Sequence, residues 1–269
     1  MNRAATIGKT FAPAKSFFEQ VGEMMILTAR TLVSAVKPPY PYGEEFIGQF
    51  LFALQLCWFP LLVSTVAFGF GAPGLQAANF LSLFGALDRL GGFFVLASIR
   101  EFAPFVTAVV VAGVAGTAIT ADLGARKIRE ELDALQVLGV DPIKNLVVPR
   151  FLALMTVTGL FNIYALIFGI FGGVLATLTF DAPLGPFFAT LLNNASTTDL
   201  WGSVVKTTLF GAIIAIVSCY KGMTASGGAE GVGRAVNQGV VIEFLGIFAF
   251  NYVFTQTLLA THPEISIIK

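Results

Sequence analysis

Residues 122–142, DLGARKIREELDALQVLGVDP, combine charged and apolar side chains more densely than any other part of the chain. Ile128, Leu132, Leu135 and Leu138 recur at steps of three or four residues, which is the spacing of one helix face. A glycine and a proline follow, as is typical just beyond a helix C-terminus. The stretch therefore predicts a short amphipathic helix. It either floats at a membrane interface or docks its acidic face into a soluble partner; that face comprises Glu130, Glu131 and Asp133.

Side chains suited to metal binding or nucleophilic catalysis are scarce. The single histidine, His262, lies near the C-terminus, and the two cysteines, Cys57 and Cys219, are far apart in or beside apolar stretches. This spacing indicates neither a disulfide framework nor a metal motif, and reduced, buried thiols are the simpler interpretation. Clustered catalytic groups are also lacking within the apolar segments. We therefore expect no catalytic site, no metal site and no cofactor bound by this chain.

Two glycine-containing segments superficially resemble nucleotide-binding loops. Gly8 is followed by lysine and threonine, as at the end of a P-loop, but the glycine required five residues earlier is Arg3. The glycines of 227–233 miss the GxGxxG pattern because position 236 is valine. The chain is not expected to hydrolyse ATP, so energy for any transport must come from a partner or a gradient. The net charge of +0 gives no bulk attraction for nucleic acid.

The composition is that of an integral membrane protein. Of the 269 residues, 56% are hydrophobic and 12% charged, whereas soluble domains carry about 25% charged residues. Apolar runs of about 20 residues are long enough to cross about 30 Å of hydrocarbon as helices. Lys206 and Glu243 lie near the ends of two such runs, where Lys206 could snorkel to the interface. The five predicted spans are 47–70, 102–121, 151–180, 200–220 and 240–261.

The distribution of arginine and lysine predicts the orientation. If five segments span and the N-terminus is cytoplasmic, twelve of these residues fall on the inner side, and the C-terminus is extracytoplasmic. Segment 76–99 is hydrophobic but carries Asp88 and Arg89 in its middle. A sixth crossing there would place the first two basic regions on opposite faces of the membrane. We therefore expect 76–99 to form a re-entrant or outer-face helical hairpin.

The chain is expected to form a single all-α domain over residues 1–269, with a membrane core at 47–261. Residues 1–46 form a cytoplasmic or interfacial segment that lacks the apolar core of a cleavable signal. Within it, 17–36 is expected to lie as a helix on the membrane surface, the alternative being a disordered tail. Small residues at four-residue steps predict two helix-packing seams, unless they are a coincidence of composition. These are Ala108, Ala112, Gly116 and Thr120, and Ala165, Gly169, Gly173 and Thr177.

Arg100 and Glu101 form the clearest charged pair at a span edge. Adjacent residues on a helix do not face each other, so one could pair with another span while the other faces a cavity or a lipid headgroup. Pairing between spans is the favoured interpretation. Gradient-driven carriers usually place ionisable groups deep in the membrane, and here the candidates lie near span ends, which argues against a buried proton relay. The 27 phenylalanines suit an apolar passage, although ordinary lipid-facing packing accounts for most of them.

Several motifs together resemble one known family. ADLGARKIREELDALQVLGVDPI at 121–143, LVVPR at 146–150, REFAPFVTAVVVAG at 100–113 and CYKGMTASGGAEGVGRAVNQGVV at 219–241 are similar to segments of the MlaE/YrbE permeases, as is Asn251 in the last span. These permeases are the membrane subunits of ABC-type lipid transporters that work with MCE proteins. The sequence of these motifs is most similar to that of the actinobacterial A-type YrbE subunit. Residues 71–99 match no pattern of the family.

The resemblance implies the assembly and the mechanism. A second YrbE-type permease would form a heterodimer with this chain, two copies of a cytoplasmic ATPase would bind beneath it and use ATP and Mg, and a ring of Mce proteins would sit on the outer face. Residues 122–142 would be the coupling helix, with the lipid, such as a fatty acid or sterol, imported across the cytoplasmic membrane. The residues expected to couple are Glu130, Glu131, Asp133, Ala134, Leu135, Leu138, Gly139, Asp141 and Pro142.

Two other functions are compatible with the residues alone. One is a gradient-driven carrier or channel for a hydrophobic solute, which would need no ATPase. The other is a membrane scaffold or an integral membrane enzyme. Against the enzyme stands the lack of clustered catalytic side chains in the spans; against the scaffold stands only the family resemblance.

Overall fold

The computed structural model describes residues 3–40 and 42–263, with the side chains of 3–17 left aside. This part of the chain is helical and contains no strand. Five helical segments are long and apolar enough to cross a membrane, which confirms the predicted all-α, five-span fold. They are Gly43–Ser82, Leu87–Ile128, Ile143–Thr179, Thr197–Met223 and Gly228–Thr261.

The spans are longer than the apolar runs of the sequence, and the first three are composites of α-helix and wider π-helical turns. The α-helices are α1 (Arg3–Val36), α2 (Gly43–Gly69), α3 (Ala77–Ser82), α4 (Leu90–Phe94), α5 (Ala103–Val111), α6 (Thr117–Ile128), α7 (Glu131–Val137), α8 (Val148–Thr179), α9 (Leu184–Asn194), α10 (Thr197–Met223) and α11 (Gly228–Thr261). The π-helical turns are η1 (Phe70–Gln76), η3 (Val95–Phe102), η4 (Ala112–Gly116) and η5 (Ile143–Val147), and η2 (Leu87–Arg89) is a 3-10 turn.

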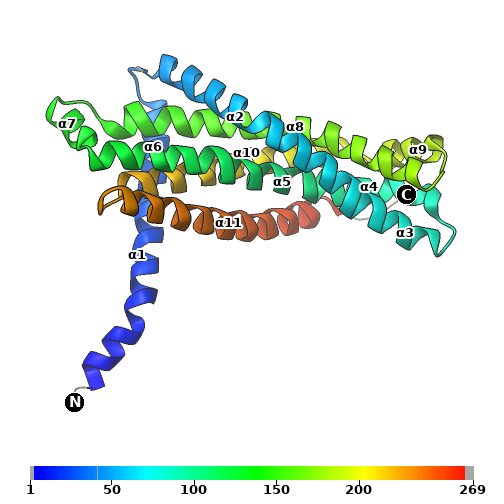
Figure 1. Cartoon of the computed structure of the whole chain (residues 1–269), viewed down its shortest axis with the longest axis horizontal. Helices are drawn as coiled ribbons and strands as arrows, with labels where there is room; N and C mark the ends of the chain where they lie inside the picture. The colour runs from blue at the N-terminus through cyan, green and yellow to red at the C-terminus, as the bar shows by residue number, and fades with distance from the viewer. Residues whose placement is uncertain (1–2, 41, 264–269) are drawn as a thin grey trace.

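The five spans lie side by side along the long axis of the molecule (Figure 1). Helix α7 lies at one end of this bundle, and α3, α4 and α9 lie at the other. We call these the α7 end and the α9 end. Helix α1 crosses the bundle near the α7 end and projects from it, so its direction differs from that of the spans.

Helix α1 begins well before the predicted start at residue 17. Met24 and Leu27 are buried against the bundle, whereas Phe18 and Met25 are about two-thirds exposed. The apolar side chains of this helix are thus divided between the protein and the surroundings. Tyr220 of α10 donates a hydrogen bond of 2.5 Å to Glu23, which ties α1 to the bundle. The location of α1 on a membrane surface stays a prediction.

Segment 76–99 forms the tip where the first two spans meet, and it contains no sixth span. The chain runs on from α2 through η1 and α3, turns at residues 83–86 and returns through η2 and α4. Gly85 supplies the turn with a positive φ of 63°, a conformation that glycine adopts at little cost. The hairpin is therefore continuous with both spans and is not a separate element.

Residues 122–142 do not form one helix, contrary to the sequence prediction. Helix α6 ends at Ile128, Glu130 adopts a left-handed φ of 61°, and α7 begins at the next residue. The break turns Leu132 into the hydrophobic core at 3% exposure and leaves Leu138 77% exposed. The segment thus breaks so that Leu132 can be buried, and it does not form the single continuous apolar face that the sequence predicted. Gly139 does follow the C-terminus of α7 with a positive φ of 76°, as predicted.

Both predicted small-residue seams are buried, which confirms that they are packing surfaces. The second seam runs along α8. Cβ atoms added at Gly169 and Gly173 would meet Ser98 of η3 and Phe94 of α4, while the backbone of Gly69 of α2 approaches that of Gly169 closely. Gly172, beside this seam, faces the end of α2 and the start of η1. A Cβ atom there would lie 2.6 Å from both the Phe70 nitrogen and the Val66 oxygen. Small residues therefore set the distance between the first and third spans.

Replacing Gly172 by alanine should destabilise the bundle by about 1–3 kcal/mol, because the new methyl group meets backbone atoms that cannot rotate away. Gly48→Ala in α2 is the matched control, since nothing lies within 4 Å of its Cβ position. The stability of the control should equal that of the wild type or exceed it slightly, because alanine favours the helical conformation over glycine. Thermal unfolding in detergent measures both variants. Equal melting temperatures for the two variants would contradict the close α2–α8 contact.

Candidate functional site

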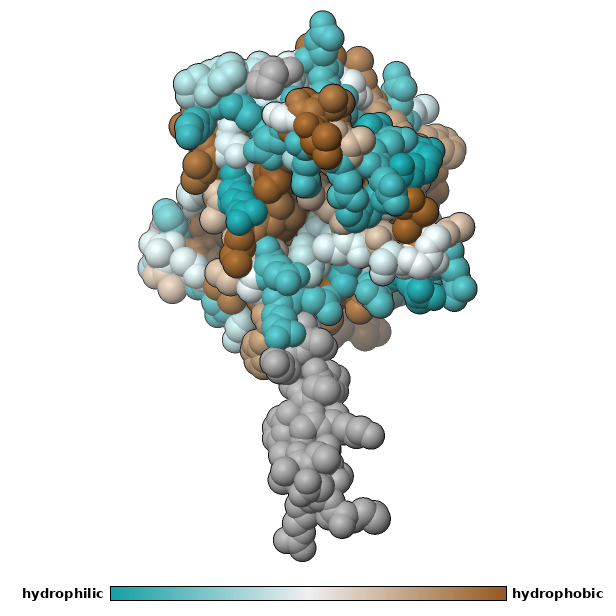
Figure 2. Space-filling model, turned by 90° about the vertical axis from the view of Figure 1, so that its left-hand side faces the viewer, coloured by the Kyte–Doolittle hydropathy of each residue, from teal (hydrophilic) through white to brown (hydrophobic). Residues whose placement is uncertain are grey.

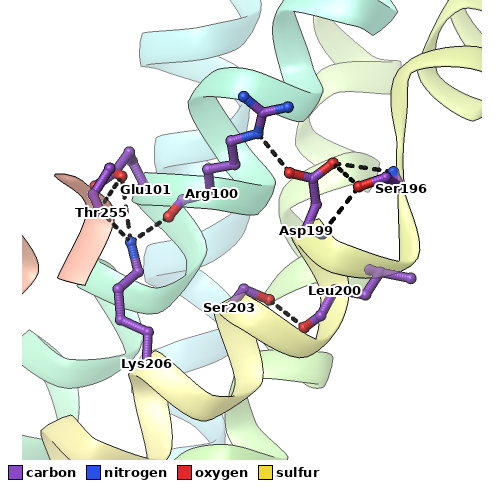
Figure 3. A network of polar contacts seen from close by, with 8 residues as sticks. All are labelled: Arg100, Glu101, Ser196, Asp199, Leu200, Ser203, Lys206 and Thr255. Atoms are coloured by element: carbon purple, nitrogen blue, oxygen red, sulfur yellow. Dashed lines mark hydrogen bonds and ion pairs between the residues drawn. The ribbon is translucent and has the colours of Figure 1, made fainter. Parts of the chain in front are cut away.

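A cluster of charged and polar side chains lies toward the α9 end of the bundle, where η3, α10 and α11 meet (Figure 3). Three elements far apart in sequence supply it. Arg100 and Glu101 come from η3, Asp199 and Lys206 from α10, and Thr255 from α11. Single π-helical turns inside α-helices are frequent at functional sites.

Arg100 pairs with Asp199 of α10. Its Nε atom lies 2.6 Å from Asp199 Oδ1, and the Asp199 side chain is wholly buried. The other carboxylate oxygen accepts a hydrogen bond of 3.0 Å from the Ser196 backbone, while Ser196 Oγ accepts one of 3.1 Å from the Asp199 backbone. This reciprocal pair is a capping box that starts α10. One carboxylate therefore both begins a helix and holds it against η3.

Lys206 is 3% exposed and does not snorkel to the interface, contrary to the sequence prediction. Its ammonium group donates to the Arg100 carbonyl oxygen at 2.5 Å and to Glu101 Oε1 and Thr255 Oγ1 at 3.3 Å each. The three donors of a lysine are thus all engaged. Three protein acceptors replace the water that the headgroup region would have supplied, which explains why the side chain turns inward.

Glu101 joins η3 to α10 and α11. Its Oε1 accepts a hydrogen bond of 2.8 Å from Thr255 Oγ1, in addition to the one from Lys206. Its Oε2 accepts a hydrogen bond of 2.8 Å from Asn251 Nδ2. Arg100 and Glu101 therefore contact different partners, as adjacent helical residues do. Both are paired with other spans, which is the arrangement that the sequence favoured. Sequence reasoning did not identify Asp199, although Ser196 and Asp199 have the capping-box spacing.

Two cavities flank η3. A cavity of about 200 Å³ lies over the charged cluster, and its lining includes charged and hydroxyl side chains together with leucines. A groove of about 380 Å³ lies by η1, α3 and η3 and is almost wholly apolar. The cavity is lined by Leu96, Arg100, Glu101, Asp199, Gly202, Ser203, Lys206, Thr255, Leu258 and Leu259. The groove is lined by Ala72, Pro73, Gln76, Ala77, Phe80, Leu81, Phe93 and Phe102.

The predicted coupling residues lie at the opposite, α7 end. Glu131 pairs with Arg129 at 2.7 Å and Asp133 with Lys127 at 2.9 Å, so two of the three acidic residues already have basic partners in the same segment. The most exposed apolar side chains of α7 and its C-cap are Val137 and Leu138, at 88% and 77%. Figure 2 shows this end, where hydrophilic side chains surround separate apolar patches.

The remaining coupling residues have structural settings that the sequence could not assign. Ala134 is exposed, Leu135 packs partly against the core, and Pro142 is buried. Asp141 Oδ1 accepts a hydrogen bond of 2.9 Å from the backbone of Ile143, the first residue of η5. Asp141 and Pro142 thus lie just before the third span, while Val137 and Leu138 present apolar surface.

A buried arginine holds the α7 end together. Arg150 of α8 is 1% exposed, and it contacts Asp122 of α6 at 2.9 Å and Glu45 of α2 at 3.4 Å. Asp122 also pairs with Arg126 at 3.1 Å. Each end of the bundle therefore has its own buried ionic anchor. In the described part of the chain, no group of three His, Cys, Asp or Glu side chains is placed to hold a metal ion.

Comparison with known proteins gives consistent matches. The family model described as Permease MlaE matches residues 46–257. A probable ABC transporter permease protein of Rickettsia typhi is 31% identical over 96% of this chain and 98% of its own length. A probable ABC transporter permease protein of Synechocystis is 37% identical over 66% of this chain and 68% of its own. The Arabidopsis thaliana protein TRIGALACTOSYLDIACYLGLYCEROL 1, chloroplastic, is 35% identical over 68% of this chain and 52% of its own.

Proposed function

The chain belongs to the MlaE family of ABC transporter permeases, and from this premise we propose that it moves a hydrophobic lipid across the cytoplasmic membrane. As such a permease it is a multi-pass, non-catalytic membrane subunit that works with an ATPase partner. In the proposal the chain binds no cofactor, and the partner uses ATP and Mg. The transported molecule would be a fatty acid, a sterol or a similar lipid.

The observation that carries the lipid proposal is the pair of cavities around η3. The lining of the smaller cavity includes both charged or hydroxyl groups and leucines, and the lining of the larger groove includes phenylalanines. A lipid has the same division into a polar head and apolar tails, and ligand pockets commonly combine apolar walls with a few placed polar groups. The name of the Arabidopsis relative is that of a galactolipid, which also supports a lipid substrate.

The assembly that we propose fits the unpartnered faces of the first and last spans. In their most apolar windows, these spans are only 22% and 17% buried, against 56% for the other three. A second YrbE-type permease would cover part of this surface in a heterodimer of the actinobacterial kind. A ring of Mce proteins would sit over the α9 end, with that end extracytoplasmic, the N-terminus cytoplasmic and transport directed inward.

The proposed contact with two copies of the ATPase lies at the α7 end. The exposed Val137 and Leu138 provide an apolar anchor of the kind that dominates binding energy at interfaces. The acidic residues Glu130, Glu131 and Asp133 lie at the start of the same short helix. The second span ends at Ile128, two residues before the cap of α7, so movement of α7 would reach η4 and η3 through α6.

Reconstitution into proteoliposomes with the partner permease and ATPase tests the proposal. We expect a labelled fatty acid or sterol to cross only when ATP and Mg are supplied on the side of the α7 end. A gradient-driven carrier would behave differently. Transport that survives ATP depletion and collapses with the proton gradient would overturn the ATP-driven mechanism and favour that alternative.

A further inference from the structure

Glu243 occupies a position that the sequence did not indicate. It was expected near the start of a span at 240–261, but α11 begins at Gly228, which places Glu243 about 22 Å along the helix at 1.5 Å per residue. Its side chain faces α10 and η4 at 1% exposure. Glu243 is therefore buried within the bundle and does not lie at the end of its span, so its position is compatible with a buried proton site.

Only one of the two carboxyl oxygens of Glu243 has a hydrogen-bond partner. Ser218 Oγ donates to Oε1 at 2.6 Å, whereas Oε2 is buried without a partner. Oε2 lies over Gly116 of η4, where an added Cβ would be 3.0 Å from it. The neighbouring hydroxyl of Thr120 donates to the carbonyl oxygens of Gly116 and Ser218 at 3.0 and 3.3 Å, so its hydrogen is already used.

No cation among the described residues lies within ion-pair distance of Glu243. On α10, Lys221 donates to Gln20 of α1 and Gln238 of α11 at 2.7 and 3.1 Å. On α8, the guanidinium of Arg150 is held by Asp122 and Glu45. The other ionisable group nearby is the wholly buried thiol of Cys219, which supplies no positive charge.

A buried carboxylate without a counter-ion is far more costly than the neutral acid, which leaves only one uncharged O–H group without a hydrogen-bond partner. We propose that Glu243 is a proton-binding site. The carboxylate takes one proton from water at the α7 end, on Oε2, when α11 packs against α10 and η4. It returns that proton to water when these helices separate. The proton thus stabilises this packing of the last span and acts independently of which lipid is carried.

Infrared spectroscopy of the full chain in lipid nanodiscs tests the site without measuring transport. We expect the carbonyl stretch of a protonated carboxylic acid at neutral pH, and its loss in Glu243→Gln. Glu230→Gln is the matched control, because Glu230 is also on α11 but is 84% exposed and paired with Arg234. The control should keep the band. A wild-type spectrum without the band, or a band that persists in Glu243→Gln, would overturn the proposal.

A second variant keeps the test decisive if Glu243→Gln does not fold. Ser218→Ala removes the hydrogen bond to Oε1 but leaves the carboxyl group in place. The band should then move to higher frequency, because a carbonyl that loses its donor has a stronger C=O bond. An unshifted band in Ser218→Ala would assign the signal to another carboxyl group and would refute the proton site at Glu243.

Discussion

Reversing the charges of Glu130 and Glu131 to lysine should abolish ATP-driven transport while the protein inserts and folds normally. Glu131 pairs with Arg129 at 2.7 Å across the break between α6 and α7. A lysine there would repel that arginine and turn α7 away, and both new charges would oppose the proposed contact with the ATPase. Because the two residues are on the surface, the free energy of unfolding should change by less than about 1 kcal/mol. Lipid uptake and ATPase activity in proteoliposomes, with melting in detergent, measure these effects.

Glu230→Lys is the control for this charge reversal. Glu230 is an exposed acidic residue that also pairs with an arginine at 2.7 Å, Arg234, but it lies on α11. The Glu230→Lys substitution should leave both lipid uptake and ATPase activity near the wild-type values. Wild-type coupling in the Glu130 and Glu131 variant would contradict the docking role of α7, because a contact worth several kcal/mol cannot survive two reversed charges unnoticed.

Replacing Arg100 by methionine should destabilise the bundle by about 3–5 kcal/mol, because it leaves a buried charge without its partner. The side chain of Asp199 is 0% exposed and faces Arg100 at 2.6 Å. Asp199 also caps α10 through Ser196, so an uncompensated carboxylate would disturb the start of that span. Transport should fall together with stability. Thermal unfolding in detergent and lipid uptake of the purified complex measure the two effects.

Two further variants separate a buried pair from an ordinary surface pair. Adding Asp199→Asn to Arg100→Met removes both charges and should recover most of the lost stability, since the amide can still accept a hydrogen bond from Ser196. Arg89→Met removes a pair with Asp88 at 3.9 Å whose side chains are about 60% exposed. The Arg89→Met substitution should lower the free energy of unfolding by less than about 1 kcal/mol. If Arg100→Met melts like Arg89→Met and transports normally, Arg100 has neither a structural nor a headgroup role.

The sequence by itself determined the membrane class, the all-α fold and the number of spans. These follow from local quantities: the length of each uncharged run is compared with the thickness of a bilayer, and small residues at four-residue steps mark packing faces. The position of Asp88 and Arg89 at a hairpin tip follows from the same reasoning, because a sixth crossing would have broken the charge distribution. Such properties belong to segments and do not require knowledge of their neighbours.

Only the tertiary structure decided where the ionisable side chains point. Lys206 meets groups that lie 105 and 49 positions away in the chain, and these contacts make burial more favourable than snorkelling. The break at Glu130 depends on the site that Leu132 fills in the core, and the burial of Glu243 depends on the space left by Gly116. Each outcome is set by the atoms on the facing helix, whereas a hydropathy pattern describes only one helix at a time.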